Sequence, residues 1–161
     1  MLQYKKNKLI NLILQFELYF NEIEKPIWNK IAHYFSAGNK LDLKVYKHDE
    51  VHRYMAAYAD SDISIIPLLD TKFNAMKSNL KVLETAAKKN PAIVSKVDPY
   101  LNLPVHYVEK QTDWFKHINQ LTNDKQARIE SGLKLFEYCN TYYNFKEINS
   151  RRFDIYSQLC L

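Results

Sequence analysis

The chain has 161 residues, 47% of them hydrophobic and 25% charged, with a formal net charge of +5, which fits one globular domain and leaves an anionic ligand open. Only two glycines occur, Gly38 and Gly132, and this excludes the glycine-rich motifs GxGxxG, GxxxxGK[ST] and GxSxG. The two cysteines, Cys139 and Cys160, form no CxxC motif, so we expect neither a disulfide framework nor a zinc site, and a reducing, cytoplasmic location.

The first half of the chain has a hydrophobic pattern that predicts alternating strands and helices. An apolar run over residues 9–16 predicts a buried strand, and apolar residues at helical spacing predict a helix over residues 17–35. A second strand is predicted over residues 41–46, where apolar and polar residues alternate, and a short helix over about residues 49–59. The β-branched run over residues 63–68 then predicts a central strand of a parallel sheet.

A polar loop, one helix and two strands follow in the middle of the chain. Apolar residues at helical spacing predict the helix over about residues 78–89, and Asn90 and Pro91 end it. Short apolar runs predict the two strands over residues 92–95 and 105–108.

A helical tail is predicted over about residues 112–161. Its three helices are expected over residues 112–121, 124–142 and 145–161, with Thr112 and Asp124 as N-caps. Most aromatic residues of the tail stand at helical spacing, which indicates core or interface positions. The longest apolar runs of the whole chain have about five residues against the ~20 that a membrane-spanning helix needs, so we expect no such helix.

These elements predict an α/β fold. Strands that alternate with helices form βαβ units, and such units predict a parallel sheet with helices on both faces. We expect a single domain over residues 1–161 that ends in the helical segment. Ligands of such sheets bind outside the carboxyl ends of the strands, so the loops after Tyr46, Pro67 and Ser95 are the first candidate sites.

One row of charged residues marks the helix predicted over residues 78–89. Lys77, Lys81, Glu84 and Lys88 stand at i, i+4, i+7 and i+11, which predicts one common face. The apolar set Leu80, Leu83 and Ala87 is predicted to face elsewhere.

Lysines at a helix start point to an anion. The helix N-terminus carries partial positive charge and unpaired N–H groups, so lysines there are mildly unfavourable unless an anion joins them. A phosphate or diphosphate would accept hydrogen bonds from these N–H groups, from Lys77 and Lys81, and from Ser78, which is also the expected N-cap. Glu84 could then accept hydrogen bonds from a sugar diol. The alternative is a solvated face with an ordinary Glu84–Lys88 pair.

The same segment carries a resemblance to a known family. Residues 62–87 contain DIxxxPLxDxxFNxxKSxLKxLExAA, and PAIVS follows at residues 91–95. This run resembles the donor-binding half of GT-B-type glycosyltransferases, and it is most similar to bacterial and phage members of the broad retaining family that uses nucleotide-sugars. Residues 142–156 resemble the closing helices of these proteins more weakly.

The resemblance implies a Rossmann-like domain that holds a nucleoside-diphosphate sugar against a separate acceptor-binding domain. Lys77, Ser78 and Lys81 match the positions that hold the donor diphosphate, and Glu84 matches the glutamate that binds the donor ribose. The implied activity is transfer of a hexosyl group from the donor, which is a substrate, so no further cofactor and no metal are expected. The resemblance names no catalytic base in this chain.

The chain departs from the family pattern at three places. Met76 stands where retaining members commonly have a second acidic residue, eight positions before the ribose glutamate. Lys89 replaces the glycine that ends the helix, and we expect Asn90 to take the left-handed conformation instead. The length suffices for only one of the two domains of such an enzyme. We therefore expect the acceptor-binding half to be a separate chain or to come from a homo- or hetero-oligomer. The alternative is that this chain is a truncated or repurposed module.

Other polar residues stand at positions where a ligand or a reaction could need them. Lys47 and His48 follow the strand over residues 41–46, where a nucleotide base could lie, although a surface position is the simpler interpretation. His48 and His52 stand at i, i+4, but no carboxylate completes a metal-ligand set. Asp70 and Asp98 follow two predicted strands and are expected to cap loops rather than to act as catalysts.

Two other functions are alternatives to donor binding. The first is a non-catalytic structural or interaction module that keeps the glycosyltransferase fold and uses its tyrosine-rich C-terminal helices as a packing surface in a larger assembly. The second is nucleic-acid binding, which is not expected, because the positive charge gathers only in the 77–89 segment and no RRM, KH or helix-turn-helix signature occurs.

Overall fold

The computed structural model describes residues 11–15, 30, 33, 42–46, 55 and 58–159, and the chain divides into two compact units, residues 1–60 and 61–161. In the first unit, β1 (Asn11–Gln15) pairs in parallel with β2 (Asp42–Tyr46), so that Asn11 lies opposite Asp42 and Gln15 opposite Tyr46. Both strands lie inside the ranges that the sequence predicts. The helices predicted over residues 17–35 and 49–59 fall mostly outside the described residues.

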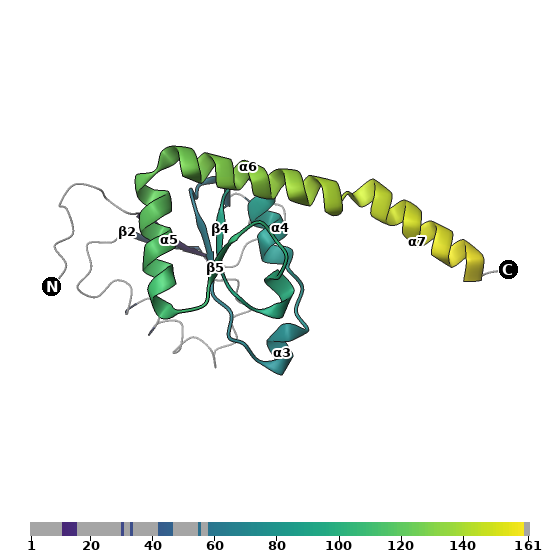
Figure 1. Cartoon of the computed structure of the whole chain (residues 1–161), viewed down its shortest axis with the longest axis horizontal. Coiled ribbons are helices and arrows are strands. Elements are labelled where there is room, and N and C mark those ends of the chain that lie inside the picture. Colours follow the sequence, from purple (N-terminus) through teal and green to yellow (C-terminus); the bar gives the residue numbers. More distant parts are fainter. Residues whose placement is uncertain are drawn as a thin grey trace. The chain divides into compact units, whose positions relative to one another are not determined.

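The second unit is mixed α/β and is drawn in teal to yellow in Figure 1. Its sheet has the strand order β3-β4-β5, and both strand pairs are parallel. The strands are β3 (Ser64–Ile66), β4 (Ala92–Ser95) and β5 (His106–Val108). The helices are α3 (Lys72–Ala75), α4 (Leu80–Ala87), the 3-10 helix η1 (Asp98–Tyr100), α5 (Gln111–Asn123), α6 (Lys125–Tyr142) and α7 (Phe145–Leu159).

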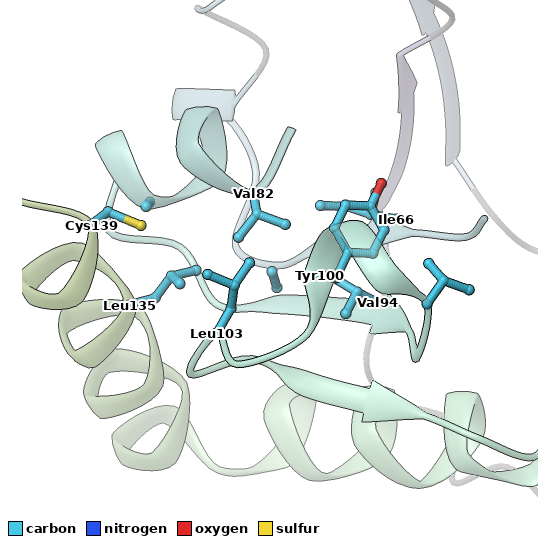
Figure 2. Close-up of a cluster of buried hydrophobic side chains, with 10 residues drawn as sticks. Ile66, Val82, Val94, Tyr100, Leu103, Leu135 and Cys139 are labelled. Atoms are coloured by element: carbon cyan, nitrogen blue, oxygen red, sulfur yellow. The ribbon is translucent and has the colours of Figure 1, made fainter. Parts of the chain in front are cut away.

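Adjacent residues of β4 contact helices on opposite sides of this sheet. Val94, which pairs with Ile66 and Tyr107, belongs to a buried cluster with Val82 of α4 and Leu135 of α6 (Figure 2). The neighbouring Ile93 points the other way, into a second cluster. That cluster contains Val108, Leu121, Trp114, Ile118 and Ile63. The parallel α/β arrangement that the sequence predicts is therefore present in this unit.

Helix α6 comes very close to the end of α4. A Cβ atom placed on Gly132 would lie 2.0 Å from the carbonyl oxygen of Lys89, so only glycine fits at this contact. Lys89 itself has φ 58°, and its Nζ lies 4.9 Å from the centre of the Phe136 ring. The expectation that Asn90 takes the left-handed conformation is wrong. Asn90 instead donates its side-chain N–H to the carbonyl oxygen of Ser61 at 2.9 Å.

Of the two N-caps predicted for the helical tail, one is confirmed and the other is wrong. Asp124 caps α6, because its carboxylate accepts a hydrogen bond from the N–H of Ala127 at 2.9 Å. Thr112 does not cap α5, which begins one residue earlier and has Lys110 as its N-cap. The carboxylate of Asp113 accepts the N–H of Lys110 at 2.9 Å and lies in the first turn, where a negative charge is favourable.

The aromatic residues of the tail do not all enter a core. Trp114 packs against the second cluster and Cys139 lies in the first, where burial raises the pKa of the thiol and makes it a poor nucleophile. By contrast, Tyr142 and Phe145 are exposed, and α7 buries none of its residues.

Within the described part of the chain, every helix is too short or too polar to cross a bilayer.

We expect Gly132→Ala to lower the free energy of unfolding by about 1–3 kcal/mol, because the added methyl group overlaps the Lys89 backbone. The better helix propensity of alanine would offset only about 1 kcal/mol of the strain. Urea denaturation measures the change. Lys134→Ala, at an exposed position of the same helix, is the control and should change the value by less than about 0.5 kcal/mol. Equal stabilities of the two variants would contradict the close contact.

We expect Lys89→Gly to be about 1 kcal/mol more stable than Lys89→Ala, because a left-handed residue with a Cβ atom is strained and glycine is not. Both variants lose the ammonium group over Phe136, so the comparison isolates the backbone. Thermal and urea unfolding of the pair measure the difference. An alanine variant as stable as the glycine variant would rule out a left-handed conformation at this residue.

Candidate functional site

The candidate site lies where α4 begins. Because β3 and β4 are parallel neighbours, the helix that joins them runs back along the sheet, and its first residues lie at the carboxyl end of the strands. Lys77 and Ser78 stand in the turn between α3 and α4, and both are exposed. The N–H of Lys77 donates to the carbonyl oxygen of Asn74 at 3.1 Å. This turn places Lys77, Ser78 and the α4 start next to one another along the chain.

The N-cap of α4 is Asn79 and not Ser78, so that prediction is wrong. Asn79 makes no side-chain hydrogen bond to the first turn of the helix. Its amide instead donates to the hydroxyl oxygen of Tyr143 at 2.7 Å, at the far end of α6. The side chain at the N-cap position is thus used for a tertiary contact and not for capping. The carbonyl oxygen of Asn79 accepts the N–H groups of Val82 at 2.9 Å and Leu83 at 3.2 Å, but the Asn79 side chain offers no acceptor to the first turn of α4.

The buried face of α4 agrees in part with the apolar pattern of the sequence. The sheet and α6 cover Val82, Thr85 and Ala86, and Leu83 packs partly buried against the same cluster. Leu80, by contrast, is 54% exposed, and Ala87 is exposed as well.

The four charged residues therefore have different surroundings. Glu84 is buried, with 8% of its surface exposed, and Lys81 is half-buried. Lys77 and Lys88 are exposed. The four charged residues therefore do not form a face that is solvated along its whole length. A buried carboxylate is stable only with hydrogen-bond donors around it, so Glu84 occupies a polar position that the fold holds in place.

Helix α3, which the sequence pattern did not predict, lies directly before the site. Thr71 caps it by accepting the N–H of Asn74 at 3.2 Å, and the Asn74 amide donates to the carbonyl oxygen of Leu69 at 2.8 Å. The threonine three residues before Asn74 is the local signal that could have found this short helix. The Phe73 ring is 76% exposed, and the Lys77 Nζ lies 5.3 Å from its centre.

The other strand ends carry polar contacts of their own. Ser95, the last residue of β4, accepts the N–H of Leu68 at 2.9 Å. Lys96 forms an ion pair with Glu109 at 2.6 Å, and the hydrogen bond with this carboxylate raises the pKa of Lys96. Asp70 is exposed in the loop after β3. Asp98 is the first residue of η1, and it is exposed as well.

The remaining candidates give little support for other chemistry. Lys47, His48 and His52 lie outside the described residues. Within the described ranges, no group of three or more histidine, cysteine or acidic side chains could hold a metal ion. A shallow hollow of about 510 Å³ lies between Lys96, the loop over residues 101–104, Tyr107 and Tyr138, and none of the proposed donor-binding residues lines it.

Comparison of the chain with protein-family models, with curated proteins and with solved structures gives no match. The resemblance to the glycosyltransferase donor half therefore depends on the residues of the 62–95 segment themselves.

The exposures at this site lead to an expectation about stability. Lys77→Ala and Ser78→Ala should each change the free energy of unfolding by less than about 0.5 kcal/mol, because both side chains are exposed. Glu84→Ala should lower it by about 1–3 kcal/mol, because the change empties a buried polar position. Urea denaturation tests the contrast, and a Glu84→Ala protein as stable as the other two would show that the buried carboxylate is not part of the fold.

Proposed function

We propose that the second unit binds a nucleoside-diphosphate sugar at the start of α4. The observation that carries this proposal is the combination of Lys77, Ser78 and Lys81 around a helix start whose N-cap offers no side-chain acceptor. The first turn of α4 also contains no acidic residue. An anion at this place would accept hydrogen bonds from backbone N–H groups and from both lysines.

The diphosphate is the part of the ligand that these residues would hold. Lys77 and Ser78 are exposed and free to reach a ligand in solution, and Lys81 stands one turn further along. Two ammonium groups and the helix dipole would neutralise the negative charge that grows on the diphosphate as the glycosidic bond breaks. These groups would therefore both bind the donor and stabilise its leaving group.

Glu84 is the residue proposed for the ribose. Its carboxylate stands one turn after Lys81 on the same helix, and an ionised carboxylate can accept hydrogen bonds from both hydroxyls of a vicinal diol. Its burial at 8% exposure restricts the side chain, which lowers the conformational entropy lost on binding. Lys47 and His48 remain proposed neighbours of the base.

The proposed reaction is transfer of a hexosyl group by a Rossmann-like, GT-B-type glycosyltransferase. This unit would supply the donor site, and a separate domain or another subunit would bind the acceptor. No residue of the second unit is assigned as a catalytic base. We place the protein in a reducing compartment such as the cytoplasm, where the buried thiol of Cys139 stays reduced.

A second candidate is a non-catalytic interaction module with the same fold. The observation in its favour is α7, which buries none of its residues and exposes Phe153, Ile155 and Tyr156 by 56% or more. A helix with such side chains is suited to packing against another protein in a larger assembly. Donor binding at α4 and packing through α7 are compatible, so the decisive question is whether the α4 site binds a donor.

Calorimetric titration of the full chain with UDP, GDP and their sugars tests the proposal. We expect saturable binding that Lys81→Ala and Glu84→Gln each weaken by about 10–100-fold, which corresponds to hydrogen bonds with charged groups of about 1.5–3 kcal/mol. Lys88→Ala is the matched control, because it removes the same charge from the opposite end of α4 and should leave the affinity within about threefold.

Two results would contradict the proposal. A folded chain that binds none of these nucleotides would favour the interaction module. Binding that Lys81→Ala and Lys88→Ala weaken equally would indicate a general attraction of anions to a basic helix and no donor site.

A further inference from the structure

Two histidines meet where α5 and α6 pack against the edge strand β5. His106 belongs to β5 and His117 to α5, and their ring centres are 5.2 Å apart with an angle of 54° between the ring planes. The Nε2 atom of His106 lies 3.1 Å from the hydroxyl oxygen of Ser131 on α6. The pair therefore connects three elements of the second unit. Neither ring takes part in the proposed donor site.

One hydrogen bond of His117 determines which tautomer its neutral ring adopts. Its Nε2 atom lies 3.0 Å from the carbonyl oxygen of Tyr107, and a carbonyl oxygen can only accept, so Nε2 carries the proton. The Nδ1 atom is then an unprotonated acceptor, and it is buried without a hydrogen-bond partner. Among the described residues, no donor or acceptor lies within hydrogen-bond distance of this Nδ1 atom.

The charged groups around the pair come mainly from α5. Asp113 stands one turn before His117 and interacts with it electrostatically, but its carboxylate already accepts the N–H groups of Glu109 and Lys110. The positive charge of Lys116, also on α5, contributes to lowering the pKa of Asp113. From α6 the contact is the neutral hydroxyl of Ser131, and from β5 it is the Tyr107 carbonyl.

The surroundings of His106 disfavour a positive charge on its ring. Its burial, and in second place the neighbouring His117, lower its pKa below 6.5. A histidine whose pKa folding lowers takes up its proton more readily in the unfolded chain. The folded state is therefore favoured above about pH 6.5 and loses this advantage as the pH falls through that value toward the lower, folded-state pKa.

We propose that His106 and His117 form a pH-sensitive contact that holds α5 and α6 on β5 when both rings are neutral and loosens on acidification. Protonation of His106 places positive charge on a half-buried ring whose centre lies 5.2 Å from that of His117, and the buried Nδ1 atom of His117 has no hydrogen-bond partner. This charge opposes the packed arrangement. The second cluster, which contains Trp114 and Leu121 of α5, would be the part of the core that opens first.

Urea denaturation of the full chain at about pH 7.5 and about pH 5 tests this contact. We expect the wild-type midpoint to fall on acidification and the double variant His106→Gln/His117→Gln to lose most of that fall. Glutamine keeps a polar atom near the Nε2 position and cannot take up a proton in this range. His33→Gln, at an exposed helical position of the first unit, is the control and should keep the wild-type fall.

NMR titration of the histidine ring protons supplies a second readout that needs no folded double variant. In the wild-type chain we expect one ring to titrate below pH 6.5, and we expect its pKa to rise in His117→Gln, because the neighbouring positive charge is gone. A wild-type midpoint that is equal at both pH values, a double variant with the full wild-type fall, or a His106 ring that titrates at its ordinary value would each overturn the proposal.

Discussion

The backbone contact between Gly132 and Lys89 determines where α4 lies, and the candidate site depends on α4. At one end of α4, the missing side chain of Gly132 lets α6 approach the carbonyl oxygen of Lys89. At the other end, Asn79 donates to the hydroxyl of Tyr143. The two contacts show that α6 runs antiparallel along α4. Leu135 and Cys139 fill the space between them with buried apolar surface (Figure 2).

This arrangement gives the candidate site a helix that packing holds in place, with exposed side chains just before its start. Val82 and Ala86 hold α4 on the sheet, and Glu84 is buried with them. Lys77 and Ser78 precede the helix and remain exposed. A packed helix with N–H groups at its start and exposed cations beside it suits the binding of an extended anion, because the backbone part of the site is already in place.

Much of the fold follows from local sequence patterns. The strand over residues 92–95 agrees in every residue with β4, and Asp124 caps α6, because hydrophobic runs and capping residues act over a few neighbouring positions. The failures come from distant partners. Asn79 is the N-cap in place of Ser78, and its side chain bonds to Tyr143, while Lys89 takes the left-handed conformation beside Gly132. No pattern within α4 contains those partners.

The site residues show the same division. The spacing of Lys77, Lys81 and Glu84 was visible in the sequence, and the structure places Lys77 just before α4, Lys81 in its first turn and Glu84 in its middle. The burial of Glu84 and the exposure of Leu80 were not visible, because they depend on α6 and the sheet together. The contact between His106 and His117 also joins residues of different elements, so only the folded chain reveals it.

The most direct test of the α4 site is an NMR titration of the full chain with UDP that follows each backbone amide. The account predicts shifts concentrated at residues 77–84, with little change at the hollow beside residues 101–104 and at the pair His106 and His117. Shifts that gather at the hollow, or an unchanged spectrum at saturating UDP, would contradict the claim that the start of α4 is an anion-binding site.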